Sequence, residues 1–294
     1  MVKRLYVIIN PASGQPKPVL HTLNSVFRAA GVDWDVFITK ESSNAHHFAR
    51  EALAAGADVV AAFGGDGTVM EVASALMGSQ VPVAILPGGT ANVMSVELGI
   101  PKDLEAAAQI ACNLSSQIQA VDVGQMGERI FMLRVGLGFA ADHVIGATRE
   151  MKDRYGELAY TISALETLKK LPLARYRLTL DGEQVEVEGV TCRVDNSGNM
   201  GIPGLVASRA ISVCDGLLDV TVIRNADGAS LYSIVASASG HGTPNPEAFF
   251  HRQAREIILE ADPPQRVVGD GEEWGETPIS VRVLPQAVRF LVCP

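Results

Sequence analysis

The sequence Phe63-Gly64-Gly65-Asp66-Gly67-Thr68 joins a run of apolar residues to a helical pattern. The run that it ends, Val59–Phe63, is typical of a buried strand. After it, apolar side chains recur every three or four residues over Val69–Met77, as an amphipathic helix requires. Because glycines lack a Cβ atom, this loop can turn sharply and bring its N–H groups and the helix N-terminus against a phosphate. The alternative is that the glycines serve close packing alone.

A second glycine loop, Leu86-Pro87-Gly88-Gly89-Thr90-Ala91-Asn92, follows the next predicted strand, Val83–Leu86. Strands and helices alternate along this part of the chain. The other predicted elements are the strands Leu5–Ile9 and Asp35–Ile38 and the helices Val19–Ala30 and Asn44–Ala55. Such alternation predicts an α/β domain with a parallel sheet covered on both faces, in which ligands bind at the C-terminal ends of the strands. Two glycine loops at that edge favour an anion-binding site.

The pattern changes after Val121 to short alternating segments joined by turns, which predicts a second, mostly antiparallel β-rich domain. Two helical stretches, Leu158–Leu171 and Ala229–Ala238, interrupt these segments. Val288–Val292 is one more predicted strand, and its pattern does not indicate to which domain it belongs. The other strands predicted here are Arg129–Val135, Tyr176–Leu180, Gln184–Val187, Leu218–Ile223, Glu256–Glu260 and Ile279–Leu284.

The chain has 294 residues, about twice the usual length per domain. Its formal charge of −9, from 24 Lys and Arg against 33 Asp and Glu, argues against a nucleic-acid partner and a polybasic membrane anchor. Its four cysteines form no close pair, which excludes a zinc knuckle or a CxxC redox centre. We expect a cytoplasmic protein without a transmembrane segment, because no stretch of about 18 apolar residues is present. The sequence does not indicate an oligomeric state.

Several common catalytic motifs are missing from the sequence. No Gly-Lys dipeptide occurs, so neither glycine loop is a Walker A motif, and neither HExxH nor GxSxG is present. The segment Gly136–Ala141 fits GxGxxA but lacks a surrounding βαβ unit. Packing at a strand–helix junction therefore accounts for that segment better than dinucleotide binding does.

Three more segments accompany the two glycine loops, in an order that resembles a known family. They are Asn10-Pro11-Ala12-Ser13-Gly14, Asp215-Gly216-Leu217-Leu218-Asp219-Val220, and Asp270-Gly271-Glu272 with the downstream Trp274-Gly275-Glu276-Thr277-Pro278. The chain is similar to the diacylglycerol kinase catalytic-domain family, soluble lipid kinases that include bacterial diacylglycerol kinases and the sphingosine and ceramide kinases. Each motif alone is modest, and their joint order and spacing are specific.

This resemblance implies a fold and an activity. The fold would be a three-layer α/β ATP-binding domain, similar to phosphofructokinases, over residues 1–122 and 286–294. A β-rich lipid-substrate domain would span residues 123–285, with the C-terminal strand returning to the first domain. The activity would be ATP- and Mg-dependent transfer of the γ-phosphate to the hydroxyl of a diacylglycerol-like or sphingoid lipid. The protein would reach that lipid by transient association with the membrane surface.

The resemblance also assigns roles to individual residues. Asp66 would act through the metal–nucleotide complex, and Glu272 would be the general base. A structural magnesium would be held by Asp215 and the backbones of Ser212 and Leu217. The residues that would hold ATP are Asn10, Pro11, Ala12, Ser13, Gly14, Thr39, Gly64, Gly65, Asp66, Gly67, Thr68 and Thr90.

Two Asp-Gly-Glu triplets compete for the role of the base. Asp181-Gly182-Glu183 lies between two alternating runs, where Asp-Gly is a good hairpin turn, so we assign it no chemistry. The pattern alone also allows a turn at Asp270-Gly271-Glu272, and it is the resemblance that selects Glu272. One departure from the family is Met70, where an asparagine is usual.

Two other functions remain open at this point. NAD kinases share a GGDGT loop and a related first domain, although the segments at Asp215 and Asp270 favour a lipid kinase. A non-catalytic nucleotide or lipid sensor could retain the same fold. The presence of Asp66, Asp215 and Glu272 argues against such a sensor.

Overall fold

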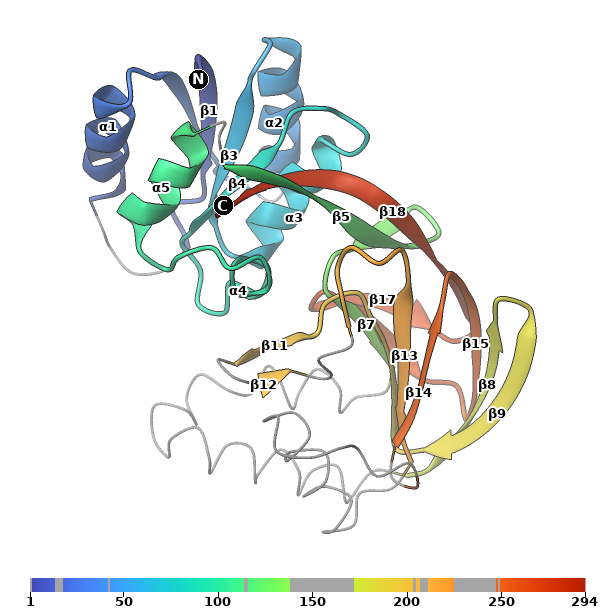
Figure 1. Ribbon diagram of the computed structural model, residues 1–294. Coiled ribbons are helices and arrows are strands. Elements are labelled where there is room, and N and C mark those ends of the chain that lie inside the picture. Colours follow the sequence, from blue (N-terminus) through green and yellow to red (C-terminus); the bar gives the residue numbers. More distant parts are fainter. Residues whose placement is uncertain are drawn as a thin grey trace, which may run out of the picture. The chain divides into compact units, whose positions relative to one another are not determined.

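The computed structural model describes residues 2–13, 18–41, 43–113, 116–137, 172–202, 205–206, 211–224, 247 and 249–293. The chain divides into two compact units, residues 1–122 with 285–294 and residues 123–284 (Figure 1). It leaves the first unit within strand β5 (Gln117–Met126) and returns within β18 (Ile279–Val292). The helical stretches expected at Leu158–Leu171 and Ala229–Ala238 lie outside the described residues.

The first unit is built on a parallel sheet in the order β2-β1-β3-β4, which confirms the predicted strand–helix alternation. The end of β18 pairs in parallel with β4 through Phe290 and Val83, so the C-terminal strand belongs to this sheet. Every residue of β3 is buried. The strands are β1 (Arg4–Ile9), β2 (Asp33–Ile38), β3 (Val59–Gly64) and β4 (Val83–Pro87).

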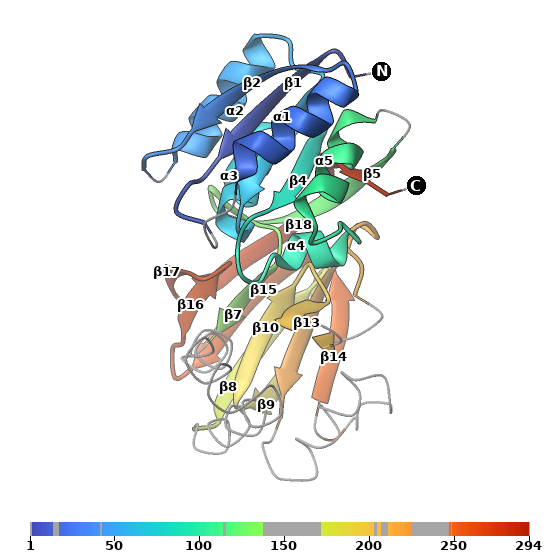
Figure 2. The same ribbon diagram turned by 90° about the vertical axis from the view of Figure 1, so that its left-hand side faces the viewer.

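Helices cover both faces of this sheet, with α1 and α5 on one face and α2 and α3 on the other (Figures 1 and 2). Helix α3 begins at Asp66 rather than at Val69, because Gly65 is extended and serves as its N-cap. Helices α4 and α5 were not predicted. The five helices of the described residues are α1 (Val19–Ala29), α2 (Asn44–Ala54), α3 (Asp66–Ala75), α4 (Val93–Glu97) and α5 (Leu104–Cys112).

The two glycine loops touch each other backbone to backbone. Strands β3 and β4 pair so that Gly64 lies beside Pro87, which brings both loops to the same sheet edge. The N–H groups of Gly88 and Gly89 donate to the Gly64 carbonyl at 2.9 and 3.1 Å. A Cβ atom on Gly89 would lie 2.5 Å from the Cα of Gly65, closer than real Cβ contacts. Only glycine therefore fits at position 89 without displacing the first loop.

The second unit is mainly antiparallel, as the sequence predicts, and its strands form a sandwich of two sheets. Their facing sides form one apolar core, in which Tyr176 and Ile257 of one sheet and Val194 and Val220 of the other are fully buried. One sheet joins β18 to β15 (Glu256–Asp262), β8 (Ala174–Leu180) and β9 (Glu183–Gly189). The other has the order β14 (Phe249–Ala254), β13 (Leu218–Ile223), β10 (Thr191–Asp195), β7 (Arg134–Leu137), β16 (Arg266–Gly269) and β17 (Glu272–Glu276).

The strand expected at Arg129–Val135 is interrupted, and one carboxylate accounts for the break. Its two parts are β6 (Arg129–Phe131), which pairs with β5, and β7. The consecutive N–H groups of Met132, Leu133 and Arg134 all donate to the Asp270 carboxylate, at 2.8, 3.1 and 2.8 Å. Backbone donors at Met132 and Leu133 thus bind a side chain in place of a neighbouring strand. A further small pair, β11 (Asn199–Ile202) and β12 (Leu205–Val206), completes the described elements.

The segments predicted as two strands, Ile279–Leu284 and Val288–Val292, form the single strand β18. Its course bends at Gln286, which has a φ of 51°. The Gln286 N–H donates to the buried Asp122 carboxylate at 2.7 Å. The alternation of buried and exposed side chains therefore shifts in the middle of the strand, and for this reason the sequence predicts two strands instead of one.

Both Asp-Gly-Glu triplets form the same two-residue hairpin turn. Asp181 and Gly182 have φ values of 49° and 89°, and Asp270 and Gly271 have 45° and 91°. Positive φ at both positions is the requirement of a type I′ turn, which Asp-Gly meets. The Asp181 carboxylate also accepts backbone N–H groups, from Arg255 at 2.9 Å and from Glu256 at 2.8 Å. The turn predicted at Asp181 is confirmed, and the turn at Asp270 is its counterpart.

We expect Gly89→Ala to lower the free energy of unfolding by about 1–3 kcal/mol, because its methyl group must push the two loops apart. The matched control is Gly67→Ala, since an added Cβ there has no heavy atom within 4 Å. That variant should be unchanged or slightly more stable, because alanine is the better helix former. Urea denaturation measures both. Equal effects would show that the contact between Gly65 and Gly89 does not limit the loops.

We expect Asp270→Asn to cost about 1–3 kcal/mol of stability, because its amide NH₂ would face buried N–H donors. Asparagine tolerates positive φ, so the turn itself is preserved. Asp181→Asn is the control, since Asp181 is exposed and its N–H donors can turn to water. Thermal and urea unfolding compare the two variants. A larger loss in Asp181→Asn would contradict the anchoring role of Asp270.

Candidate functional site

The predicted phosphate loops lie where four neighbouring strands of the first unit end. Asn10 follows β1 and ties the segment after that strand to the first glycine loop, residues 63–68. Its side-chain Nδ2 donates to the buried Thr68 hydroxyl at 3.1 Å, and its Oδ1 accepts the Ala12 N–H at 3.0 Å. Its own N–H donates to the Phe63 carbonyl at 2.9 Å. Asn10 therefore holds the segment after β1 against the first glycine loop.

Other predicted nucleotide residues lie at the same edge. Thr39 follows β2 and is buried, and its N–H and hydroxyl both donate to the Ile9 carbonyl, at 2.9 and 3.4 Å. Pro11, Ala12 and Thr90 are exposed, and Ser13 is half-buried. Gly14 lies outside the described residues.

The glycines of the first loop leave the start of helix α3 open. A Cβ atom on Gly64 would collide with the Thr68 side chain, whereas one on Gly67 would meet nothing. Gly88 and Gly89 turn their N–H groups inward to Gly64, so the second loop buttresses the first. N–H groups in the first turn of a helix have no intrahelical acceptor, and the helix dipole favours negative charge there. The start of α3 is thus the part of the edge best suited to bind a phosphate.

Asp66 is the first residue of α3 and is half-buried. Its Oδ1 accepts the N–H of Met94, in the first turn of α4, at 3.1 Å. This bond orients the carboxylate and uses one of its two oxygens. A carboxylate at this position can hold a divalent cation beside a phosphate bound to the loop.

The predicted metal residues of the second unit share one turn before β13. The Leu217 N–H donates to Asp215 Oδ1 at 3.0 Å, and the Cys214 N–H donates to the Ser212 hydroxyl at 3.4 Å. The Asp215 carboxylate and the carbonyls of Ser212 and Leu217 form an all-oxygen donor set, which fits Mg²⁺. Among the described residues no group of three or more His, Cys, Asp or Glu side chains could hold a metal ion. Magnesium here would therefore depend on one carboxylate, carbonyls and water.

Glu272 begins β17, directly after the Asp270-Gly271 turn, and its side chain is exposed. Its neighbour Glu273 is also exposed, as expected, and forms an ion pair with Arg266. Burial raises the pKa of Asp270 to about 6, and the three backbone N–H donors oppose that rise. Those three donors favour the ionised form of the Asp270 carboxyl. Asp66 and Glu272 belong to different units of the chain.

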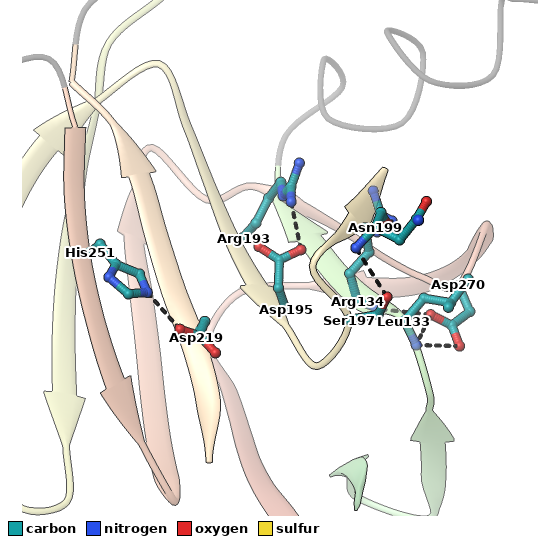
Figure 3. Close-up of polar contacts among 9 residues, drawn as sticks. All are labelled: Leu133, Arg134, Arg193, Asp195, Ser197, Asn199, Asp219, His251 and Asp270. Carbon is teal, nitrogen blue, oxygen red and sulfur yellow. Dashed lines mark hydrogen bonds and ion pairs between the residues drawn. The ribbon is translucent and has the colours of Figure 1, made fainter. Parts of the chain in front are cut away.

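One face of the β14-β13-β10 sheet carries buried charges that the sequence analysis missed (Figure 3). Asp195 and Asp219 lie directly opposite each other on β10 and β13, and both are fully buried. Arg193 donates to Asp195 at 2.6 Å, and His251 lies 2.6 Å from Asp219 (Figure 3). Charged residues alternating with Val194 and Val220 were the available signal, but alternation usually indicates a face in water.

Comparisons with known proteins find relatives of both units. The model of the diacylglycerol kinase catalytic domain matches residues 4–126, and that of the YegS C-terminal NAD kinase beta sandwich-like domain matches residues 134–292. A Bacillus subtilis diacylglycerol kinase is 26% identical over 282 residues, covering 94% of this chain and 92% of that protein. An uncharacterized Synechocystis protein is 31% identical over 239 residues. The match covers 80% of this chain and 55% of that protein's length.

A solved structure also resembles this chain over nearly its whole length. A crystal structure of a diacylglycerol kinase candidate from Bacillus anthracis str. Sterne matches with a TM-score of 0.80 and 28% identity. The match covers 99% of this chain and 95% of that one.

Within the described ranges, no helix of this chain is long and apolar enough to cross a bilayer. The two units, their order and their motifs place the chain in the diacylglycerol kinase catalytic-domain family, with a second unit of the YegS C-terminal type.

Proposed function

We propose that the chain is an ATP- and Mg²⁺-dependent lipid kinase that phosphorylates the hydroxyl of a diacylglycerol-like or sphingoid lipid. The observation that carries the proposal is the pair of interlocked glycine loops, which opens helix α3 with Asp66 at its first residue. Family membership supports the use of ATP. The name of the Bacillus subtilis relative supports a lipid acceptor.

The proposed mechanism uses positioning and charge neutralisation. Phosphoryl transfer needs little covalent chemistry from the protein, so donors placed around the phosphates supply most of the effect. In this chain the N–H groups at the start of α3 would bind the phosphates, and Asp66 would orient the metal–nucleotide complex. Bound Mg²⁺ would supply positive charge against the transferred group. Asn10, Thr39 and Thr68 would act by fixing the loops.

The acceptor hydroxyl must lose its proton during transfer. Glu272 would accept that proton as a general base, a role worth about 10²–10⁴-fold in rate. Its exposure keeps it accessible to a substrate entering from solvent or from a membrane surface. Asp270 would support it indirectly, by anchoring the turn from which β17 begins.

The direct test incubates the protein with labelled ATP, Mg²⁺ and a total lipid extract, followed by identification of the labelled product. A parallel incubation replaces the lipid extract with NAD. A labelled phospholipid is the expected product. Labelled NADP would favour the NAD kinase alternative, and no transfer to either acceptor would favour a non-catalytic sensor.

Asp66→Asn separates catalysis from stability. Asparagine keeps an oxygen for the Met94 N–H, so the free energy of unfolding should change by less than about 0.5 kcal/mol. Turnover should fall to below about one tenth of wild type, because the charge that orients the metal–nucleotide complex is lost. Asp66→Ala should lose both turnover and some stability. Full activity of Asp66→Asn would refute the metal–nucleotide role.

Glu272→Gln tests the general base, and Glu183→Gln is its structural control. Both glutamates are exposed and begin the second strand of an Asp-Gly hairpin. We expect kcat of Glu272→Gln to fall about 10²–10⁴-fold with little change in KM for ATP, because the proton acceptor is removed. Glu183→Gln loses only an exposed pair with Arg252, worth about 0–1 kcal/mol, and should keep its turnover. Reversed phenotypes would move the base to Glu183.

A further inference from the structure

A chain of polar contacts joins the proposed metal turn to β14, the edge strand of its sheet. Gln253 of β14 donates through Nε2 to Asp215 Oδ2 at 3.2 Å. The same Nε2 makes a longer contact, 3.5 Å, to Asp219 Oδ2. The other oxygen of Asp219 lies 2.6 Å from His251 Nε2 (Figure 3). Gln253 thus bridges an exposed carboxylate and a fully buried one.

The chemistry of these groups fixes the orientation of the Gln253 amide. Both neighbours are carboxylates, which accept hydrogen bonds, and only the NH₂ end of a carboxamide can donate two of them. Asp219 is fully buried on β13, and its Oδ1 lies 2.6 Å from His251 Nε2, which restricts the positions its carboxylate can take. Asp219 therefore serves as the fixed point from which Gln253 reaches Asp215.

Both oxygens of the Asp215 carboxylate accept a hydrogen bond. Each carboxylate oxygen has two lone pairs. The Leu217 N–H uses one on Oδ1, and Gln253 uses one on Oδ2. Hydrogen bonds on both oxygens restrict the rotation of the carboxylate, and a carboxylate held in one orientation is the better ligand for a cation in an oxygen-only shell.

We propose that Gln253 is a positioning residue for Mg²⁺ bound at Asp215, with Asp219 and His251 as its support. This inference rests on the proposed function, which places Mg²⁺ at Asp215. Hydrogen bonds to a ligating carboxylate from groups outside the coordination shell typically change metal affinity about 10- to 100-fold when they are removed. Gln253 should therefore set the affinity of this turn for Mg²⁺ without touching the ion.

The test is a magnesium titration of the nucleotide-free protein, in which the melting temperature is measured at each magnesium concentration. Gln253→Leu removes the amide and keeps similar bulk. Arg252→Leu is the matched control, because Arg252 is the exposed neighbour on the same strand and pairs with Glu183 instead. Asp215→Asn reports any magnesium effect that does not come from this turn. Melting in a chelator, before magnesium is added, checks that each variant folds.

We expect Mg²⁺ to raise the melting temperature of the wild type and of Arg252→Leu at the same midpoint concentration. Gln253→Leu should need at least about ten times more Mg²⁺, while its melting temperature in chelator stays within about 2 °C of wild type. A merely structural role would lower that chelator value and leave the midpoint unchanged, which would overturn the proposal. If Gln253→Leu melts early, Gln253→Ala repeats the comparison at smaller volume.

The remaining outcomes separate this inference from the proposed function. An unchanged midpoint in Gln253→Leu, with the response lost in Asp215→Asn, would refute the role of Gln253 and leave the metal site in place. A response that survives in Asp215→Asn, or no response in the wild type, would refute the metal site at Asp215. The role of Gln253 would then fall with it, whereas lipid phosphorylation would remain open to its own assay.

Discussion

The close approach of Gly65 and Gly89 is the constraint on which the edge of the first unit depends. Parallel pairing of β3 and β4 brings the two loops level, and a side chain on Gly89 would keep them apart. The N–H groups of Gly88 and Gly89 both donate to the Gly64 carbonyl, so these two donors of the second loop support the first loop. The anion-binding capacity of the edge therefore concentrates at the start of α3. We therefore expect the first glycine loop to contact the ligand and the second to hold the first in shape.

The two Asp-Gly-Glu triplets show that a local turn does not determine a function. Their backbone angles match, and in each the aspartate binds backbone N–H groups of a neighbouring segment. The two turns differ in the segments that carry these N–H donors. Asp181 meets the start of β15, whereas Asp270 binds three consecutive residues and so separates β6 from β7. The assignment of chemistry to Glu272 rests on family resemblance, because the turns alone are equivalent.

The sequence was sufficient for the first sheet, where apolar strands and periodic helices follow the rules for a covered parallel sheet. It also located both glycine loops, because a cluster of glycines directly after a buried strand is typical of a sharp turn into a helix. It did not predict β10, where charged residues alternate with apolar ones although Asp195 is fully buried and Arg193 largely so. It failed at β18 because a bend at Gln286 shifts the alternation. Gln253 was beyond prediction, since its place beside Asp215 follows from the pairing of β13 with β14.

The register in which β13 pairs with β14 also shows how buried carboxylates are tolerated in the second unit. Directly opposed like charges on neighbouring strands destabilise a sheet, and Asp195 and Asp219 are such a pair. Arg193 comes from the same strand as Asp195, while His251 reaches Asp219 from β14. Compensation of Asp219 thus requires β14 to pair in its observed register, where Gln253 lies opposite Asp219. The same register sets Gln253 against Asp215, so the requirement to satisfy a buried charge also fixes the turn that precedes β13.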